Sequence, residues 1–390
     1  MTDDRPGRVP ANTLFILKAV GLAGGLAALA GLLSAQTRVW PGLLVAALWL
    51  VGVGLGGLMF VAIQYVSGAE WSVAFRRVPE AMTSTLLAGA LLLLAVLVGH
   101  PALYPWMGKL APDPEGTLWF RHWWLAQPFF LIRSVIYLTT WLAFAVAIVR
   151  RSRRQDRTGE VALTRENAGL SAAGLVACGI TLWLASCDWV QSLEPEWYST
   201  IFGVYHFSGI MTGGLAVIVL CTVWLHRQGI LRAAPTEQHL LDLGRLLFAF
   251  CTFWMYIWFS QYMLIWYANI PEETVYFVRR LNDGWGAVFL ANMLLNWAIP
   301  FLVLLPQRCK QSWRILSAVA GVVLLGRFVD LYQMVYPPVV AGPPGIGGWE
   351  IAIWLGALAI AALAILVTIG SAAIHPVKDP SFAKSLQYQQ

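Results

Sequence analysis

The sequence predicts an all-α integral membrane protein with ten transmembrane helices. Hydrophobic residues make up 58% of the 390 residues, and the mean hydropathy is +0.66. Charged residues make up only 12%, whereas a soluble globular chain carries about a quarter. Twenty tryptophans, 12 tyrosines and 18 phenylalanines fit a chain that crosses the membrane interface many times. Together these observations exclude a water-soluble enzyme, a disordered tail and a nucleic-acid-binding protein.

Ten stretches are each apolar over roughly the 20 residues that are needed to cross a hydrocarbon core about 30 Å thick. In chain order they are 13–33, 41–66, 83–99, 122–149, 170–188, 200–225, 243–268, 285–305, 314–336 and 349–374. We expect the first to be a retained helix, because it follows Thr2-Asp3-Asp4 and is longer than the apolar core of a signal peptide. The chain then forms a single polytopic domain, residues 1–390.

The distribution of Lys and Arg predicts the orientation. If the N-terminus is cytoplasmic, eighteen of these residues fall in the inner segments and five in the outer ones, which are Arg38, Lys109, Arg121, Arg279 and Arg280. Inner segments carry the excess of positive charge in membrane proteins. Both termini are therefore expected to be cytoplasmic.

The connections between the spans are too short to form a soluble domain. The longest are 100–121 and the basic segment 150–169. The outer loop 188–199 carries Glu194 and Glu196 and has no cation of its own. We expect these two glutamates to lie in a hydrated loop.

The five cysteines are scattered and form no C-x-x-C, C-x-x-C-H or ferredoxin-like run. We therefore expect neither covalent haem nor an iron–sulfur cluster in this chain, and no metal site. A b-type haem with two histidine ligands needs two of them at similar depth on facing helices. Only His206 lies well inside a span, with His122 at the edge of another, so such a haem is not expected either.

Ionisable and hydrogen-bonding side chains inside membrane spans are costly and indicate function by default. Most of those in this chain map to the outer half of the spans or to the midplane. The candidates for quinol binding or proton transfer are Arg133, Asp188, His206, Arg327 and Asp330, with His122, Tyr205 and Gln261 as secondary candidates. The inner half offers mainly Lys18 and Gln64, followed by Glu70, Arg76, Arg77 and Glu80, which are expected to be surface charges.

Two charge pairs are expected among these candidates. Arg327 and Asp330 are three residues apart, so they share a helix face and can neutralise one another. Arg133 has no partner in its own helix and must pair with another helix, through Asp188 or Asp330. At 1.5 Å per residue from His122, Arg133 would lie about 16 Å along its span, near the midplane.

Acids, histidines and amides near the outer surface suit two functions. They could bind a quinol headgroup, which needs hydrogen-bond partners on both oxygens and a base that accepts its protons. They could also release protons outward. In either case Asp188 and His206 would accept protons, Arg133 would hold a carboxylate or a headgroup oxygen, and Arg327–Asp330 would act as a switchable pair or as a purely structural one.

Four groups of residues also resemble a known family. They are Asp188-Trp189-Val190-Gln191-Ser192-Leu193-Glu194-Pro195 with Glu196–Tyr205; Gln127–Arg133; Trp258–Tyr262 with Ile265–Glu273; and Gly326–Tyr332. In combination they resemble the smaller polysulfide-reductase-like (NrfD-type) membrane subunit of alternative complex III. The resemblance covers roughly residues 40–375.

The resemblance implies a quinol:electron-acceptor oxidoreductase complex of the bacterial inner membrane. It implies two four-helix bundles, spans two to five (41–190) and six to nine (200–336), flanked by the helices 13–33 and 349–374. The implied partners are a larger NrfD-like membrane subunit, an iron–sulfur subunit, multihaem and monohaem cytochrome c subunits, and a terminal oxidase. The haems and iron–sulfur clusters would belong to these partners, while menaquinone or ubiquinone would be the quinone.

The expected role is therefore that of a membrane subunit that supports quinol oxidation, and proton translocation with it, without being catalytic on its own. No catalytic residue is assigned, because the resemblance places the quinol-oxidising site in the larger membrane subunit. Two alternatives stay open. One is a purely structural membrane anchor of the complex. The other is a secondary transporter, a class whose spans are often broken at the midplane, although no span here is plainly broken there by Pro or Gly.

Overall fold

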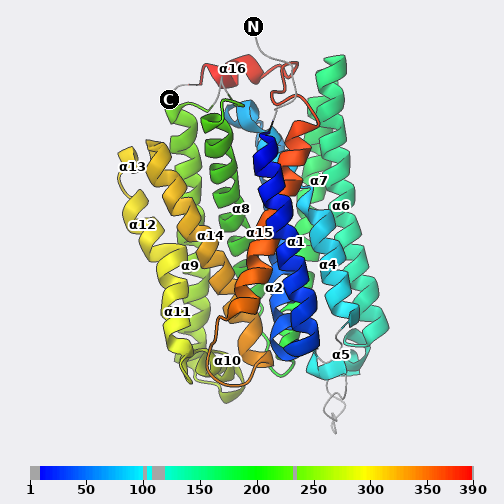
Figure 1. Cartoon of the computed structure of the whole chain (residues 1–390), viewed down its shortest axis with the longest axis vertical. Helices are drawn as coiled ribbons and strands as arrows, with labels where there is room; N and C mark the ends of the chain where they lie inside the picture. Colours follow the sequence, from blue (N-terminus) through cyan, green and yellow to red (C-terminus); the bar gives the residue numbers. More distant parts are fainter. Residues whose placement is uncertain (1–8, 100–102, 108–118, 232–234, 389–390) are drawn as a thin grey trace.

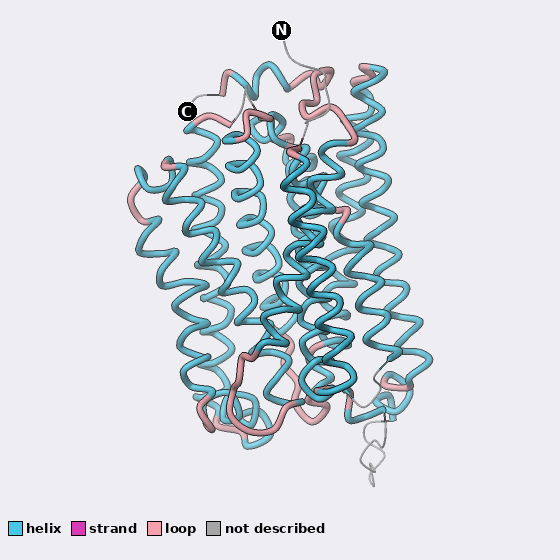
Figure 2. The backbone as a smooth tube through the Cα atoms, viewed as in Figure 1, coloured by secondary structure: helices cyan, strands magenta, loops and turns pink. Residues whose placement is uncertain are grey.

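The computed structural model describes residues 9–99, 103–107, 119–231 and 235–388. Helices connected by turns and loops make up this described part, and no extended strand occurs in it (Figure 2). Within it, ten helical segments are long and apolar enough to cross a membrane: Ala11–Ser34, Gln36–Ser67, Arg77–Gly99, Gln127–Thr158, Ala162–Leu193, Phe202–Arg227, Glu237–Ala268, Trp285–Leu304, Trp313–Val339 and Gly348–Gly370. The predicted all-helical, multi-pass membrane protein is thus confirmed.

Some of these segments are divided, and short helices connect others. In chain order the α-helices are α1 (Ala11–Ser34), α2 (Gln36–Ser67), α3 (Arg77–Met82), α4 (Thr85–Gly99), α5 (Trp119–Trp124), α6 (Gln127–Thr158), α7 (Ala162–Trp189), α8 (Phe202–Arg227), α9 (Glu237–Ala268), α10 (Pro271–Leu281), α11 (Trp285–Met293), α12 (Ile299–Leu304), α13 (Gln307–Gln311), α14 (Trp313–Val339), α15 (Gly348–Gly370) and α16 (Phe382–Leu386). A 3-10 helix η1 (Trp71–Phe75) follows α2, and a π-helical segment η5 (Leu294–Ala298) separates α11 from α12.

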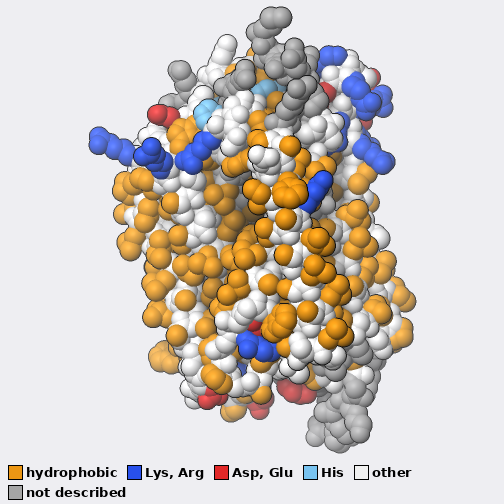
Figure 3. Space-filling view, viewed as in Figure 1, with side chains coloured by type: hydrophobic (Ala, Val, Ile, Leu, Met, Phe, Trp, Pro, Cys, Tyr) orange, Lys and Arg blue, Asp and Glu red, His pale blue; other side chains and the backbone are white. Residues whose placement is uncertain are grey.

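The long helices run between two ends of the molecule (Figure 1). We call the end at which α1 begins and α16 lies the N-terminal end, and the end that holds α5 and α10 the distal end. Apolar side chains cover the middle of the face seen in Figure 3, and Lys and Arg side chains gather toward its N-terminal end. This arrangement matches a helical protein whose middle lies in hydrocarbon.

Helix α2 is the central element. It packs against α4, α7, α8, α14 and α15, and the apolar part of this helix is entirely buried. Glycine allows α2 and α8 to approach closely, since a Cβ atom on Gly56 would lie 2.7 Å from the Cα atom of Gly214 in α8. Small residues let membrane helices approach in this way. By contrast, α1 is peripheral and packs mainly on α15.

Several helix ends differ from the sequence prediction. Helix α6 begins at Gln127, not at 122, because Pro128 suits the first turn of a helix and Ala126 is extended. The segment 150–169, predicted as a connection, is mostly helical, since α6 continues to Thr158 and α7 begins at Ala162. Hydropathy shows where a chain leaves the membrane, whereas a helix continues until its backbone is capped or broken.

Candidate functional site

The first buried cluster joins the distal ends of α6 and α7. Arg133 donates two hydrogen bonds to Asp188, from Nε to Oδ2 at 2.9 Å and from Nη2 to Oδ1 at 2.8 Å. Tyr137 and Trp124 also donate to this carboxylate, at 3.0 and 2.9 Å. The rings of Trp124 and Phe129 lie 4.0 and 4.4 Å from the guanidinium carbon, within range of cation–π attraction. A bidentate pair with this many partners is held in one geometry.

This cluster answers the question that the sequence left open about Arg133. Its partner is Asp188 and not Asp330. The expected depth was wrong, however. Because α6 begins at Gln127, Arg133 lies about 9 Å along the helix, in the distal part of the span and not near its middle.

The second buried cluster surrounds Asp330 in α14, whose side chain is fully buried. Arg327, one turn earlier, forms an ion pair with Asp330, as the spacing predicts. Tyr205 in α8 donates a hydrogen bond to the same carboxylate. Asn292 in α11 donates to Oδ1 at 2.9 Å, and Trp254 in α9 donates to Oδ2 at 3.3 Å. Four helices therefore converge on one carboxylate.

Glycines in α8 make room for the Arg327 side chain. A Cβ atom on Gly209 would overlap the guanidinium group of Arg327, and one on Gly213 would lie 3.2 Å from its Cγ. Contacts under 3.0 Å essentially never occur at a real Cβ atom. Position 209 therefore requires glycine as long as Arg327 occupies this place.

His206 lies between the two clusters. Its Nδ1 is 2.9 Å from the hydroxyl of Ser186, two residues before Asp188. On the other side, His206 and Arg327 both line a small cavity of about 20 Å³, which has room for about one water molecule. The chain thus brings Asp188, His206 and Asp330 into one region of the distal half, although no direct hydrogen bond joins the two carboxylates.

A break in helical regularity lies beside Asp330. The π-helical segment η5 precedes Pro300, which has no N–H group and whose ring would clash with a carbonyl of the preceding turn. Asn296 in this segment donates to the side-chain oxygen of Asn292 at 2.7 Å. The amide oxygen of Asn296 and the amide nitrogen of Gln333 are buried without a hydrogen-bond partner among the described residues.

Among the secondary candidates, Gln261 does not join these clusters, and the structure does not test His122. Gln261 is buried in α9, and its amide nitrogen has no hydrogen-bond partner within the described residues. His122 belongs to α5, but its side chain lies outside the described part of the structure.

The space around Asp330 does not fit a quinol ring. A cavity lined by Tyr205, Asp330 and Gln333, among others, has a volume of about 10 Å³, and ligand sites usually measure about 300–1,000 Å³. The donors and acceptors for a headgroup are present, but the room is not. In this conformation the cavity beside Asp330 is too small to enclose a quinol. The carboxylate can exchange a proton only with a neighbouring side chain or a water molecule.

The loop glutamate Glu194 is not hydrated as expected. It is buried, and its carboxylate receives hydrogen bonds from Arg279 at 2.7 Å and from Arg280 at 3.2 Å, both in α10. Arg280 also donates to the backbone carbonyls of Gln333 and Met334 at the end of α14. The sequence does not reveal this pairing, because the two arginines are more than 80 residues from Glu194.

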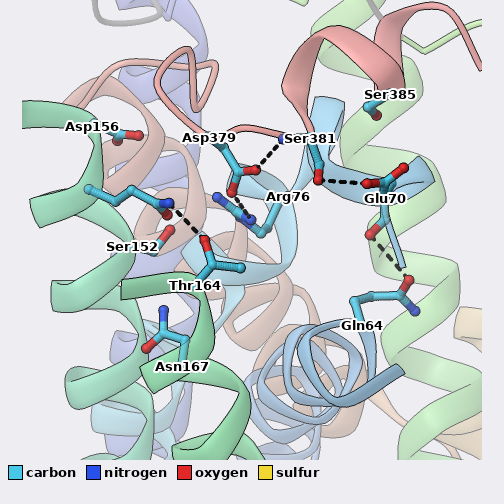
Figure 4. A network of polar contacts seen from close by, with 12 residues as sticks. Gln64, Glu70, Arg76, Ser152, Asp156, Thr164, Asn167, Asp379, Ser381 and Ser385 are labelled. Carbon is cyan, nitrogen blue, oxygen red and sulfur yellow. Dashed lines mark hydrogen bonds and ion pairs between the residues drawn. The ribbon is translucent and has the colours of Figure 1, made fainter. Parts of the chain in front are cut away.

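Of the four surface charges expected at the N-terminal end, Glu70 is exposed, but the other three are not. Arg76, Arg77 and Glu80 are buried in a third cluster. Figure 4 shows the part of this cluster in which Arg76 meets Asp379. Arg76 lies 3.3 Å from Glu80 and 2.8 Å from Asp379 of the C-terminal segment. Arg77 pairs with Glu80 and with Asp156 in α6.

The C-terminal segment completes this third cluster. Ser381 donates a hydrogen bond to Glu70 (Figure 4). Lys384 also contacts Glu70, and Ser385 donates to the carbonyl oxygen of Trp71 at 2.6 Å. Burial by itself would lower the pKa of Arg76, but Tyr65, Glu80 and Asp379 raise it above its ordinary value. Arg76 therefore remains charged, and the ion pair fixes residues 371–388 over η1.

Neither a metal site nor a related protein family can be assigned to the described residues. Within the described ranges, no group of three or more His, Cys, Asp or Glu side chains could hold a metal ion. No family model matches the sequence, and no curated protein matches it either.

Proposed function

We propose that this chain is a membrane subunit of a respiratory quinol:electron-acceptor oxidoreductase, with a role in proton transfer. The observation that carries the proposal is the fully buried carboxylate of Asp330, which is bonded to groups from four helices within a membrane span. Such groups are costly in hydrocarbon and usually mark ion or proton paths. The family resemblance supplies the redox setting.

The proposed arrangement in the membrane follows the charge distribution. With eighteen Lys and Arg residues in the segments at one end and five at the other, the N-terminal end is cytoplasmic and the distal end faces outward. Spans two to five and six to nine would form the two four-helix bundles. The membrane is then the inner membrane of a bacterium.

Oxidation of one quinol to quinone releases two electrons and two protons. In our proposal the electrons pass to the iron–sulfur and haem subunits, while the quinol binds in the larger NrfD-like membrane subunit. This chain would handle protons: Asp330 takes one up when Arg327 moves away from it, and Asp188 and His206 serve as further acceptors near the outer surface. The small cavities beside these groups have room for water but not for a quinol. They support a role for this chain in proton transfer, with quinol binding in the larger subunit.

The test is the Asp330→Asn variant of the assembled complex. We expect the complex to assemble, although the unpaired guanidinium of Arg327 lowers its stability. Quinol turnover per assembled complex should fall about tenfold or more, because general acid–base groups contribute 10²–10⁴-fold to proton-transfer steps. The matched control is Asp283→Asn, since Asp283 is exposed near the distal end. Turnover of the control should equal that of the unmodified complex. Unchanged turnover in an assembled Asp330→Asn complex would rule out the proton role.

The runner-up function is a purely structural membrane anchor. It is favoured by the two buried ion pairs Arg133–Asp188 and Arg327–Asp330, in which each charge has an opposite partner. Such pairs can hold the structure together without taking part in proton transfer. A structural role predicts that every substitution in the clusters that lowers turnover also lowers the amount of assembled complex. Measuring both quantities for the same variant separates the two functions.

A further inference from the structure

An apolar groove opens on the side of the molecule in the N-terminal half. It lies between α1, α8, α14 and α15 and has a volume of about 950 Å³. Figure 3 shows this face hollowed between α14 and α1. Its lining is mostly apolar and includes Leu17, Leu220, Val223, Trp224 and Leu366. The groove is separate from the buried clusters of the distal half, because the two sets of lining residues do not overlap.

Two arginines mark the polar end of this groove. Arg227 is the last residue of α8 and Arg314 the second residue of α14, and both line the groove. Their neighbours His226 and Trp313 stack at 4.3 Å between ring centroids, which holds the two helix ends together. Both arginine side chains are exposed, and neither forms an ion pair with another described residue. Two positive charges therefore lie at this end of the groove with no acidic partner among the described residues.

We propose that this groove binds one anionic phospholipid. The phosphate would lie between Arg227 and Arg314, and the acyl chains would run along the apolar lining toward the middle of the membrane. Arginine pairs suit phosphate because the planar guanidinium donates two parallel hydrogen bonds. Basic pockets between membrane helices on the cytoplasmic side are suited to anionic headgroups. Free phosphate would leave the apolar lining unused, and a neutral quinone would leave the arginines uncompensated.

The test is native mass spectrometry of the purified full-length chain after titration with phosphatidylglycerol, phosphatidylcholine or inorganic phosphate. We expect one phosphatidylglycerol to bind preferentially. In the Arg227→Gln/Arg314→Gln double variant its affinity should fall roughly 30-fold, because each basic residue near an anionic surface contributes about a fivefold preference. The Arg150→Gln control removes an exposed arginine from α6, outside the groove, and should bind as the unmodified chain does.

A second variant tests the apolar part of the groove without changing charge. Ala318 is exposed on α14 and lines the groove, so Ala318→Trp should fill it and weaken phosphatidylglycerol binding. Equal binding of phosphatidylcholine, tight binding of phosphate alone, or retention of a quinone in place of the lipid would each overturn the proposal. So would unchanged phosphatidylglycerol affinity in the double variant. The experiment does not depend on redox activity, so its outcome is independent of the proposed function.

Discussion

The carboxylate of Asp330 and the guanidinium of Arg327 are both buried, and each neutralises the other. Removing one partner leaves a charge in a medium that solvates it poorly. We expect Asp330→Ala to lower the free energy of unfolding by about 3–5 kcal/mol, the usual cost of breaking a buried pair. Thermal unfolding in detergent measures this loss.

The control for this prediction removes both charges at once. The Arg327→Met/Asp330→Leu double variant leaves no uncompensated charge, so most of the stability should return. If the double variant is as unstable as Asp330→Ala, the cost comes from lost packing and hydrogen bonds and not from the unpaired arginine.

Gly209 is a second position at which a single substitution should affect stability, because a Cβ atom there has no room beside Arg327. A methyl group there would overlap the guanidinium of Arg327, so Gly209→Ala should destabilise the protein by about 1–3 kcal/mol, as overpacking does. A methyl group on Gly179 in α7 would meet no atom within 4 Å. Gly179→Ala should therefore be neutral or stabilise by up to about 1 kcal/mol. Equal effects of the two substitutions, measured by thermal unfolding, would contradict this account of Gly209.

At the scale of elements, the attachment of the C-terminal segment should depend on pH. His375 lies outside the spans, and burial lowers its pKa below the ordinary value of 6.5, with the hydrogen bond to the carbonyl oxygen of Ala74 offsetting part of the shift. The detached segment therefore binds a proton before the attached one does. Attachment is at full strength above about pH 6.5 and weakens as the pH falls below this value.

Hydrogen exchange of residues 371–388 measures this attachment. Intrinsic amide exchange is base-catalysed and slows as the pH falls from 7 to 5, so each measured rate is divided by the intrinsic rate at that pH. Corrected in this way, the protection of residues 371–388 should decrease over this range. In the His375→Gln variant this pH dependence of the protection should disappear. If it persists, a different group controls the segment.

The existence of the spans could be predicted from the sequence, because about 20 apolar residues in a row have few alternative structures. The helix ends could not, as the polar extensions of α6 and α7 show. The π-helical segment was missed as well. Its signal was Pro300, since a proline inside a helix disturbs the preceding turn, but a single proline does not show which irregularity the chain adopts.

At the scale of the whole molecule, the sequence predicted part of the site. The pair Arg327–Asp330 followed from a spacing of three residues, and Asp188 was one of two alternatives for Arg133. The indole donors of Trp124 and Trp254 were missed because an aromatic side chain in an apolar run has no periodic signal. The cluster at the N-terminal end was missed because Arg76 and Asp379 are 303 residues apart. Pairs this distant in sequence become visible only when the fold is known.

We propose that this chain works within a redox complex. The most direct measurement is purification in mild detergent through a tag on this chain, followed by mass spectrometry of every co-purifying protein and an assay of quinol oxidation. We expect a second, larger membrane subunit together with iron–sulfur and c-type haem subunits, and quinol-oxidising activity in the same fraction. A chain that purifies alone, without haem or quinol oxidation, would contradict this proposal, and substrate flux in liposomes would then test the transporter alternative.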